Sequence, residues 1–442
     1  MKLIIKNVRV IDPASKYDNV TDIEIDNGVI KSLGTVVNSE NSQAKVIDGT
    51  GFVAAPGLVD IHVHFRDPGL TYKEDIQTGA NAAVAGGYTT VVMMANTKPA
   101  VDSVETLQYV AGRAKEVGDS LPIHILPAAC VSQELKGKSL TDIDALVKNG
   151  AAGITDDGIP VMDEELLEQA FVAAASHNVP VSLHEEDPNV ISENGINAGP
   201  VAEKLGLKGS PREAEIRMIE RDLPIALRTG ADVNIQHIST EEGVALVRDF
   251  RQKQLSETGE CHIHAEATPH HFSLTQEAVY EHGTLAKMNP PLRTEADRQA
   301  IIAGLKDGTI EIIATDHAPH SKDEKSRDFA KAPSGIIGLE TALSLGITNL
   351  VNPGYLTLME LMEKMSTAPA ALYHLQSGIA VGKIADIVIF DPTEERIIRD
   401  FRSKSENSPF KGSRLKGVVK YTICNGIISY SETDNDSAKE EK

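Results

Sequence analysis

Two histidines separated by one residue, His62 and His64, end an apolar run that predicts a strand over Val59–Phe65. Side chains at positions i and i+2 of a strand project from the same face, so both imidazoles would point one way. Two converging imidazoles supply half of the ligands that zinc takes in proteins. Alone, the pair is a modest signal, because this spacing also arises by chance.

Other residues that can bind metal stand at the ends of further apolar runs. These are His184 after residues 179–183, His237 after 233–236 and Asp316 after 312–315, with Asp156 and Asp157 in the segment Thr155-Asp156-Asp157-Gly158. Taken singly, each would be a hydrogen-bonded residue at a strand end, and an aspartate before Gly158 could close a turn. Together they favour a metal centre, in which a carboxylate could bridge two ions.

The elements that must position these residues are short apolar strands alternating with helices, a pattern typical of repeated β/α units and a parallel sheet. The predicted strands are Val59–Phe65, Tyr88–Met94, Ile123–Pro127, Gly153–Asp156, Val179–His184, Asp232–His237, His262–Glu266 and Glu311–Thr315. Predicted helices between them include Glu164–Ser176 and Glu241–Gln254. Eight such units predict an α/β fold, a (β/α)₈ barrel, whose active site lies where the carboxyl ends of the strands meet.

Alternating strands at both chain ends predict a second, smaller unit. Residues 3–10, 22–30, 385–390 and 418–426 read as strands, with a hairpin turn at Asn27-Gly28. We therefore predict a β-sandwich from residues 1–53 and 376–430, a barrel over 54–375, and a disordered acidic tail at 431–442.

Composition excludes several classes of function. The chain has 442 residues and a net charge of −21, which argues against a nucleic-acid or anionic-membrane partner. Its three cysteines are far apart and lack a CxxC spacing, which favours a reducing compartment. The N-terminus is not typical of a signal peptide, so the sequence predicts a cytoplasmic protein.

Several motifs, taken together, resemble the amidohydrolase superfamily and, within it, the bacterial type I dihydroorotases, over residues 1–430. They are Pro56-Gly57-Leu58-Val59-Asp60-Ile61-His62-Val63-His64-Phe65-Arg66-Asp67-Pro68-Gly69, Met94-Ala95-Asn96-Thr97, Thr155-Asp156-Asp157-Gly158, His184-Glu185-Glu186, His237-Ile238-Ser239, Ala314-Thr315-Asp316-His317-Ala318-Pro319-His320 and Ala332-Pro333-Ser334-Gly335-Ile336. The resemblance implies a hydrolase of cyclic amides that interconverts N-carbamoyl-L-aspartate and L-dihydroorotate in pyrimidine biosynthesis.

The same resemblance implies one or two zinc ions per chain. His62, His64, Asp157 and Asp316 would surround one ion, and Asp157, His184 and His237 the other. Asp157 would be the bridge, since the segment where many relatives carry a carboxylated lysine has none here. Asp316 would be the catalytic residue that transfers the proton.

Substrate contacts are implied for His64, Arg66, Asn96, Asn289, His320, Ser334 and Gly335. Arg66, Asn96 and His320 would hold the substrate carboxylate, which suits the forked hydrogen bonding of an arginine. Asn289 and the backbone at 334–335 would hold the ring amides. Alternatives remain for two of them: Arg66 could pair with Asp67 or Glu74, and Asn289 could serve the turn before Pro290.

The remaining histidines are interpreted as structural or exposed. His262 and His264 repeat the spacing of His62 and His64, and His270 and His271 are adjacent, but the metal site has no room for all of them. The others are His124, His177, His282 and His374, while His317 is expected to support a ligand.

Two other functions compete with this interpretation. One is another cyclic amidohydrolase, such as a dihydropyrimidinase, hydantoinase or allantoinase, although those relatives generally carry the carboxylated lysine. The other is an inactive scaffold for aspartate transcarbamoylase, which would be expected to lack ligands that are present here. A homodimer and an association with aspartate transcarbamoylase are expected as partners of an active enzyme, besides the small-molecule substrate.

Overall fold

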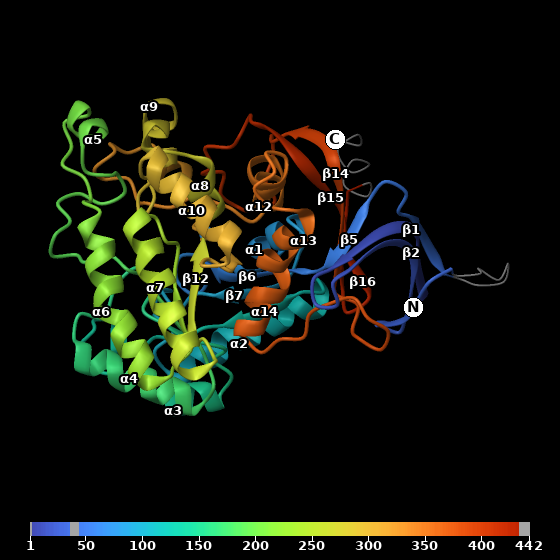
Figure 1. Cartoon of the computed structure of the whole chain (residues 1–442), viewed down its shortest axis with the longest axis horizontal. Coiled ribbons are helices and arrows are strands. Elements are labelled where there is room, and N and C mark those ends of the chain that lie inside the picture. The colour runs from blue at the N-terminus through green and yellow to red at the C-terminus, as the bar shows by residue number, and fades with distance from the viewer. Residues whose placement is uncertain (1, 36–43, 433–442) are drawn as a thin grey trace.

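Eight short strands alternate with helices in the computed structural model, which describes residues 2–35 and 44–432 (Figure 1). All eight predicted barrel strands are found, several of them shorter than predicted. They are β6 (Leu58–Val63), β7 (Tyr88–Met93), β8 (His124–Pro127), β9 (Ile154–Thr155), β10 (Val181–Leu183), β11 (Val233–Ile235), β12 (Ile263–Ala267) and β13 (Ile312–Ile313).

Parallel pairing closes these strands into a barrel. One sheet runs β6-β7-β8 and another β9-β10-β11-β12-β13, all parallel. A parallel bridge between Ala129 and Ile154 joins β8 to β9, and one between Val63 and His317 joins the first strand to the last. The predicted (β/α)₈ barrel is therefore confirmed, and the carboxyl ends of its strands share one mouth.

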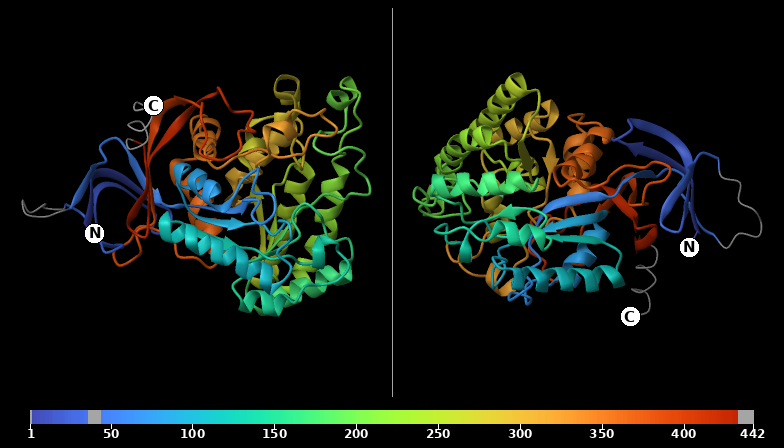
Figure 2. Two further views of the ribbon diagram at one scale, coloured as in Figure 1. Left: turned by 180° about the vertical axis from the view of Figure 1, so that it is seen from behind. Right: turned by 90° about the horizontal axis from the view of Figure 1, so that it is seen from below.

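Helices cover the outside of the barrel (Figure 2). Those of the first seven units are α1 (Ile76–Ala85), α2 (Val104–Ser120), α3 (Ile143–Lys148), α4 (Glu164–Ser176), α5 (Pro200–Lys204), α6 (Glu213–Thr229), α7 (Glu241–Thr258), α8 (Pro269–Ser273), α9 (Val279–His282) and α10 (Glu295–Asp307). After β13 follow α11 (Lys322–Lys325), α12 (Ala342–Gly346), α13 (Leu358–Met362) and α14 (Ala368–Leu372). Short 3₁₀ turns lie at Gln133–Leu135, Gln276–Ala278 and Gly283–Ala286, and π-helical turns at Ile347–Val351 and Glu363–Thr367.

The helix α4 shows why these segments fold as predicted. Its N-cap Asp163 accepts hydrogen bonds from the backbone of Glu165 and Leu166, which satisfies donors that a helix start leaves free. Leu167 and Phe171, one turn apart, are fully buried on the face toward the strands. Periodicity and capping thus agree, and the predicted range matches the observed one.

The two chain ends form one eight-stranded sheet beside the barrel, seen in all views (Figures 1 and 2). Its strands are β1 (Lys2–Asp12), β2 (Tyr17–Asp26), β3 (Val29–Leu33), β4 (Lys45–Asp48), β5 (Val53–Pro56), β14 (Ile387–Ile397), β15 (Arg414–Cys424) and β16 (Ile427–Ser431). The pairing of β5 with β14 joins the two ends, and their buried side chains share one core. The expected hairpin at Asn27-Gly28 is present, with positive φ at both residues.

The predicted division into domains at residues 53/54 and 375/376 stays a prediction. β5 crosses the first of these positions. Residues 433–442 of the predicted tail lie outside the described residues, while Ser431 ends β16. Within residues 2–35 and 44–432, no helix is both long and apolar enough to cross a membrane.

A buried carboxylate fixes the loop that follows β11. Glu215 of α6 accepts hydrogen bonds from the backbone nitrogens of Ser239 and Thr240, at 3.1 and 2.9 Å, and from both hydroxyl groups. Burial raises the pKa of Glu215, and the nearby Arg293 guanidinium opposes that shift. Because this loop starts two residues after His237, the carboxylate helps to set where that histidine lies.

We predict that Glu215→Ala lowers the free energy of unfolding by roughly 3–5 kcal/mol. The variant leaves the four buried donors of Ser239 and Thr240 without their acceptor, and it removes the carboxylate that offsets the charge of Arg293. Urea unfolding followed by circular dichroism measures the change. Glu213→Ala, at an exposed position of the same helix, is the control and should shift stability by less than about 0.5 kcal/mol. Equal midpoints for parent and Glu215→Ala would contradict the prediction.

Candidate metal centre and active site

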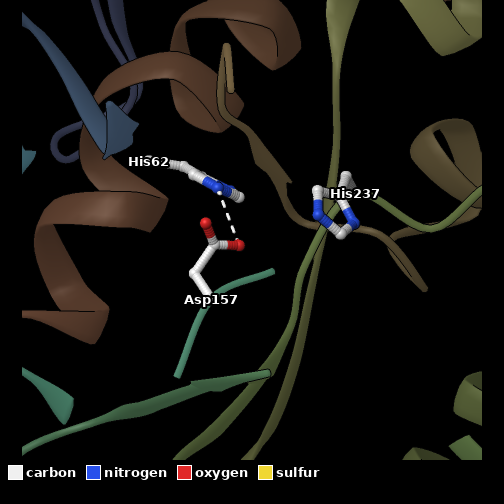
Figure 3. Close-up of side chains that lie close together, drawn as sticks. All are labelled: His62, Asp157 and His237. Atoms are coloured by element: carbon white, nitrogen blue, oxygen red, sulfur yellow. Dashed lines mark ion pairs between the residues drawn. The ribbon is translucent and has the colours of Figure 1, made fainter. Parts of the chain in front are cut away.

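All six predicted metal ligands meet at the carboxyl ends of the barrel strands. His62 lies within β6 and His64 directly follows it, while Asp157, His184, His237 and Asp316 follow β9, β10, β11 and β13. Each of the six side chains is buried. Figure 3 shows His62, Asp157 and His237 reaching one another from separate strands.

Asp157 lies at the centre of this group. Its Oδ1 is 3.4 Å from His62 Nε2 and 3.8 Å from His184 Nδ1, and its Oδ2 is 3.5 Å from His64 Nε2. One carboxylate therefore faces three imidazoles, two from the end of β6 and one from the end of β10. This is the arrangement expected of a bridge between two ions.

Asp316 completes the group on one side of Asp157, and the imidazoles of His184 and His237 complete it on the other. Asp316 Oδ1 lies 2.9 Å from His64 Nε2 and 3.5 Å from His62 Nε2. On the other side of Asp157, His184 Nδ1 lies 3.0 Å from His237 Nε2, with the two rings nearly perpendicular. The geometry thus separates into a half around Asp316 and a half around His237.

These separations suit a bound divalent ion. An ion held at about 2.0–2.1 Å in tetrahedral geometry spaces its donor atoms roughly 3.3 Å apart. Two sets of donors, His62 with Asp157 and His237, and His62 with His64 and Asp316, each lie within 4.8 Å of one another. Nitrogen and carboxylate oxygen donors are those that zinc accepts, so the residues fit such an ion.

Electrostatics prepare the donors for a cation. Burial alone would raise the pKa of Asp157, but His62, His64 and His184 hold it well below its ordinary range. Burial and the imidazoles of His184 and His62 hold the pKa of His237 well below its ordinary value. Burial would also lower the pKa of His62 and His184, but the neighbouring carboxylates raise it, so these two lose a proton when they bind metal. The carboxylate is therefore ionised and His237 neutral, which are the forms that bind metal.

Two glutamates that we did not predict orient the histidines. Glu266 Oε1 lies 2.6 Å from His62 Nδ1, and its Oε2 accepts a hydrogen bond from Asn234 at 2.9 Å. Glu186 Oε2 lies 3.2 Å from His184 Nε2. A carboxylate on the second ring nitrogen fixes the tautomer and orientation of a ligating histidine. The position of Glu266 at the end of a predicted barrel strand was the signal that could have identified it.

Asn96 is placed among the ligands. Its Oδ1 is 2.9 Å from His64 Nδ1, and its amide nitrogen donates to Asp157 Oδ2 at 3.0 Å. The amide group therefore fixes the positions of His64 and Asp157 relative to each other. Its predicted contact with the substrate carboxylate stays a prediction.

Arg66 lies beside the ligands with a positive φ of 58°. Burial lowers its pKa, while the carboxylates of Asp316 and Asp157 act in the opposite direction. Its Nε donates to the carbonyl of Pro319 at 3.4 Å, so neither alternative partner, Asp67 or Glu74, holds it through a described hydrogen bond. Residues other than glycine adopt this backbone conformation at a cost in free energy, and residues with such strain cluster at functional sites.

Two ligands share this backbone feature. His237 and Asp316 have φ values of 34° and 48°. Such values turn the chain sharply after β11 and β13. The turns aim both side chains into the mouth of the barrel rather than along its wall.

His320 lies near Arg66 and is neutral. Burial and the charges of Arg66, Lys73 and Lys325 lower its pKa. Its Nε2 donates to the carbonyl of Ser334 at 2.8 Å, and Lys73 Nζ lies 3.3 Å from its Nδ1. The imidazole is thus held by the protein at both nitrogens, and its predicted substrate contact stays a prediction.

Asn289 borders a cavity of about 420 Å³ that His184, Gly158 and Lys287 also line. Its Oδ1 and the hydroxyl of Ser334 are both buried without a hydrogen-bond partner among the described residues. Gly335 donates its backbone N–H to Lys287. An unpaired buried polar atom beside a cavity, as at Asn289, favours contact with a ligand. The predicted substrate contacts of Asn289 and of the backbone at Ser334 and Gly335 stay predictions.

A third unpredicted residue, Asn407, reaches this region from the connection between β14 and β15. Its Oδ1 accepts from the backbone of His320 at 3.1 Å, and its amide donates to Ala318 and Gly335 at 3.0 and 3.1 Å. Nothing in the sequence pattern links position 407 to the barrel mouth. The fold of the segment between β14 and β15 is what brings Asn407 to the barrel mouth.

The other histidines lie as expected. His264 is held by Asp232 and Glu311 at the opposite ends of the strands, and His262 by Asp232. His271 contacts the Thr268 hydroxyl and the Pro290 carbonyl. His317 lies 3.4 Å from Glu74 and accepts from the backbone of Gly338. They are absent from the two sets of donors around Asp157 and Asp316.

Comparison with known proteins identifies the family of this chain. A family model described as "Dihydro-orotase-like" matches residues 51–243. The dihydroorotase of Clostridioides difficile is 55% identical over 97% of this chain and 100% of its own length. That of Clostridium acetobutylicum is 49% identical over 97% of this chain and 100% of its own length.

Solved structures agree on the fold. The L-hydantoinase of Arthrobacter aurescens superposes with a TM-score of 0.83 at 24% identity, over 96% of this chain and 95% of that one. The dihydropyrimidinase of Brevibacillus agri gives 0.81 at 24% identity, over 97% and 95%. At this identity the likeness concerns the architecture alone. The full-length similarity to curated relatives decides the family: the chain belongs to the dihydroorotases.

Proposed function

We propose that this protein is a dihydroorotase, which closes N-carbamoyl-L-aspartate into L-dihydroorotate with loss of water and runs the reverse hydrolysis. The observation that carries the proposal is the meeting of His62, His64, Asp157, His184, His237 and Asp316 in one buried group. A fold that gathers six such donors from five strand ends is built for chemistry on a ligand. The scaffold alternative does not account for them.

The proposed cofactor is zinc, as one or two ions, with Asp157 as the bridging ligand. Bound zinc lowers the pKa of a coordinated water toward neutrality and polarises a carbonyl group. The family resemblance also supports a cytoplasmic homodimer in pyrimidine biosynthesis that associates with aspartate transcarbamoylase.

Asp316 is proposed to move the proton. Both of its contacts with the histidines are made by Oδ1, so Oδ2 is the oxygen that can face the substrate. In hydrolysis, Asp316 accepts a proton from the attacking water and delivers it to the ring nitrogen as the C–N bond breaks. In cyclisation, the same carboxylate accepts the proton of the carbamoyl nitrogen as the C–N bond forms.

Arg66 is proposed to hold the substrate carboxylate, with Asn96 and His320 beside it. His64 would contact the substrate from the metal side, and Asn289, Ser334 and Gly335 would hold the ring amides. The support is the position of Arg66 next to Asp316 and the unpaired polar atoms of Asn289 and Ser334. Since His320 is neutral, Arg66 would supply the charge of this clamp.

The substrate assignment is tested by assaying dihydroorotate, dihydrouracil, hydantoin and allantoin with one preparation. We expect turnover of dihydroorotate to exceed that of the others by several orders of magnitude, because only it carries a ring carboxylate for Arg66. Turnover of dihydrouracil or allantoin with none of dihydroorotate would assign the protein to the alternative group of cyclic amidohydrolases.

Removal of metal by a chelator is expected to abolish activity, and stoichiometric zinc to restore it, because water at neutral pH is otherwise too weak a nucleophile. Elemental analysis before and after treatment gives the metal content per chain. Circular dichroism checks that the metal-free protein keeps its fold. Full turnover by metal-free protein would refute the metal centre.

Asp316→Ala and Asp316→Asn are expected to lower kcat by about 10²–10⁴, the usual contribution of a positioned acid–base group. Asp316→Asn keeps an oxygen ligand, so its metal content should stay close to that of the parent. Asp328→Asn, whose side chain is 84% exposed, controls for the loss of one charge. Near-parental turnover by Asp316→Asn would remove Asp316 from its role.

Arg66→Ala is expected to raise KM by about 10–100-fold with a smaller change in kcat, since a charge-assisted hydrogen bond contributes about 1.5–3 kcal/mol. Steady-state kinetics with dihydroorotate measures both constants. Arg327→Ala removes an exposed positive charge nearby and should leave KM close to the parental value. Unchanged KM and kcat in Arg66→Ala would argue against the clamp.

A further inference from the structure

A second group of metal-binding side chains lies at the opposite end of the barrel strands from the active site. His124 is the first residue of β8, Asp386 directly precedes β14, and Cys424 ends β15. The group therefore joins the barrel to the terminal sheet. In barrel enzymes this end of the strands generally serves stability rather than catalysis.

The three side chains face one another. His124 Nε2 lies 3.1 Å from Asp386 Oδ2, and one ligand atom of each of the three residues lies within 4.8 Å of the others. Asp386 Oδ1 accepts the backbone N–H of Asn425 at 2.7 Å, which holds the carboxylate in place. The thiol of Cys424 is buried, with a weak contact of 3.8 Å to the carbonyl of Thr89.

The donor set is selective. Imidazole nitrogen, thiolate sulfur and carboxylate oxygen together suit zinc and its tetrahedral analogue cobalt(II), whereas magnesium and calcium prefer oxygen donors alone. A spacing of 3.1 Å between His124 and Asp386 matches the separation of roughly 3.3 Å between donors on one tetrahedral ion. The sulfur of Cys424 would have to move closer to the other two ligand atoms to bind the same ion.

Space for a fourth ligand lies alongside. A cavity of about 290 Å³ is lined by His124 and Asp386, and by Thr89, Thr90 and Lys383. It gives an ion a path to the two side chains and room for a water on the ion. Lys383 is the cation that lines it, and its ammonium donates to the carbonyl of Ser377.

The thiol of Cys424 holds its proton when no metal is bound. Burial and the Asp386 carboxylate raise the pKa of the Cys424 thiol, and the hydrogen bond to Asp386 raises the pKa of His124. A divalent ion that binds here replaces the thiol proton and any imidazole proton, which pass to solvent. Affinity for the ion should therefore increase with pH.

We propose that His124, Asp386 and Cys424 bind one zinc-like divalent ion that fastens the terminal sheet to the barrel. This site shares no ligand with the catalytic group, so it stands whether or not the proposed function is correct. The competing interpretation is a plain ion pair of His124 with Asp386 beside a thiol that binds nothing.

Cobalt(II) binding tests the proposal, in protein freed of zinc by a chelator so that zinc does not occupy the site. The catalytic ligands include no sulfur, so a thiolate-to-cobalt charge-transfer band in the near ultraviolet can arise only from a cysteine. We expect this band to reach the intensity of one thiolate–cobalt bond per chain in the parent and in Cys261→Ser, and to be absent in Cys424→Ser. Cys261 is the control because it is the more accessible of the other two cysteines.

A second variant keeps the test decisive if Cys424→Ser folds poorly. His124→Ala, at a partly exposed position, should lose most of the band. Cobalt should raise the thermal midpoint of the parent by more than that of His124→Ala, because an ion that binds only the folded state stabilises it and the variant keeps only the catalytic ligands. No band in the parent, or a band of equal intensity in Cys424→Ser or His124→Ala, would overturn the proposal.

Discussion

The structure depends on one buried carboxylate that must be surrounded by positive charge or by metal. Asp157 is 5% exposed and faces His62, His64 and His184 within 3.8 Å. A charge of this kind is costly to bury unless paired. The barrel meets that requirement by delivering imidazoles from separate strands to a single point, and the same arrangement forms two groups of metal-binding side chains.

Around the ligands lies a set of hydrogen bonds that fixes each of them. Glu266 holds His62, Glu186 holds His184, and Asn96 joins His64 to Asp157. Glu215 fixes the loop after His237 from a helix outside the barrel. Because Glu266, Asn96 and Glu215 lie on elements other than those of the residues they hold, the geometry of the centre depends on the packing of the whole barrel.

The charge beside the predicted substrate site is opposite in sign to the net charge of the chain. The protein carries a net charge of −21, yet Arg66, Lys73 and Lys325 gather beside the predicted substrate site, where they lower the pKa of His320. Burial and the neighbouring Lys287 lower the pKa of Lys325 itself to about 7. An anionic substrate would be held by this local field, since the rest of the molecule repels it.

The sequence by itself predicted the eight strands, the union of the chain ends and five of the six gathered side chains, because strand periodicity and ligand types at strand ends are local signals. The choice of Asp157 over Asp156 came from the family resemblance. The sequence did not reveal Asn407, which reaches His320 from 87 residues away, or the meeting of His124, Asp386 and Cys424 across two units. Nor did it reveal that the amide of Asn96, whose substrate contact stays a prediction, is hydrogen bonded to His64 and Asp157. Such contacts depend on how distant loops pack, and no periodicity along the chain encodes that packing.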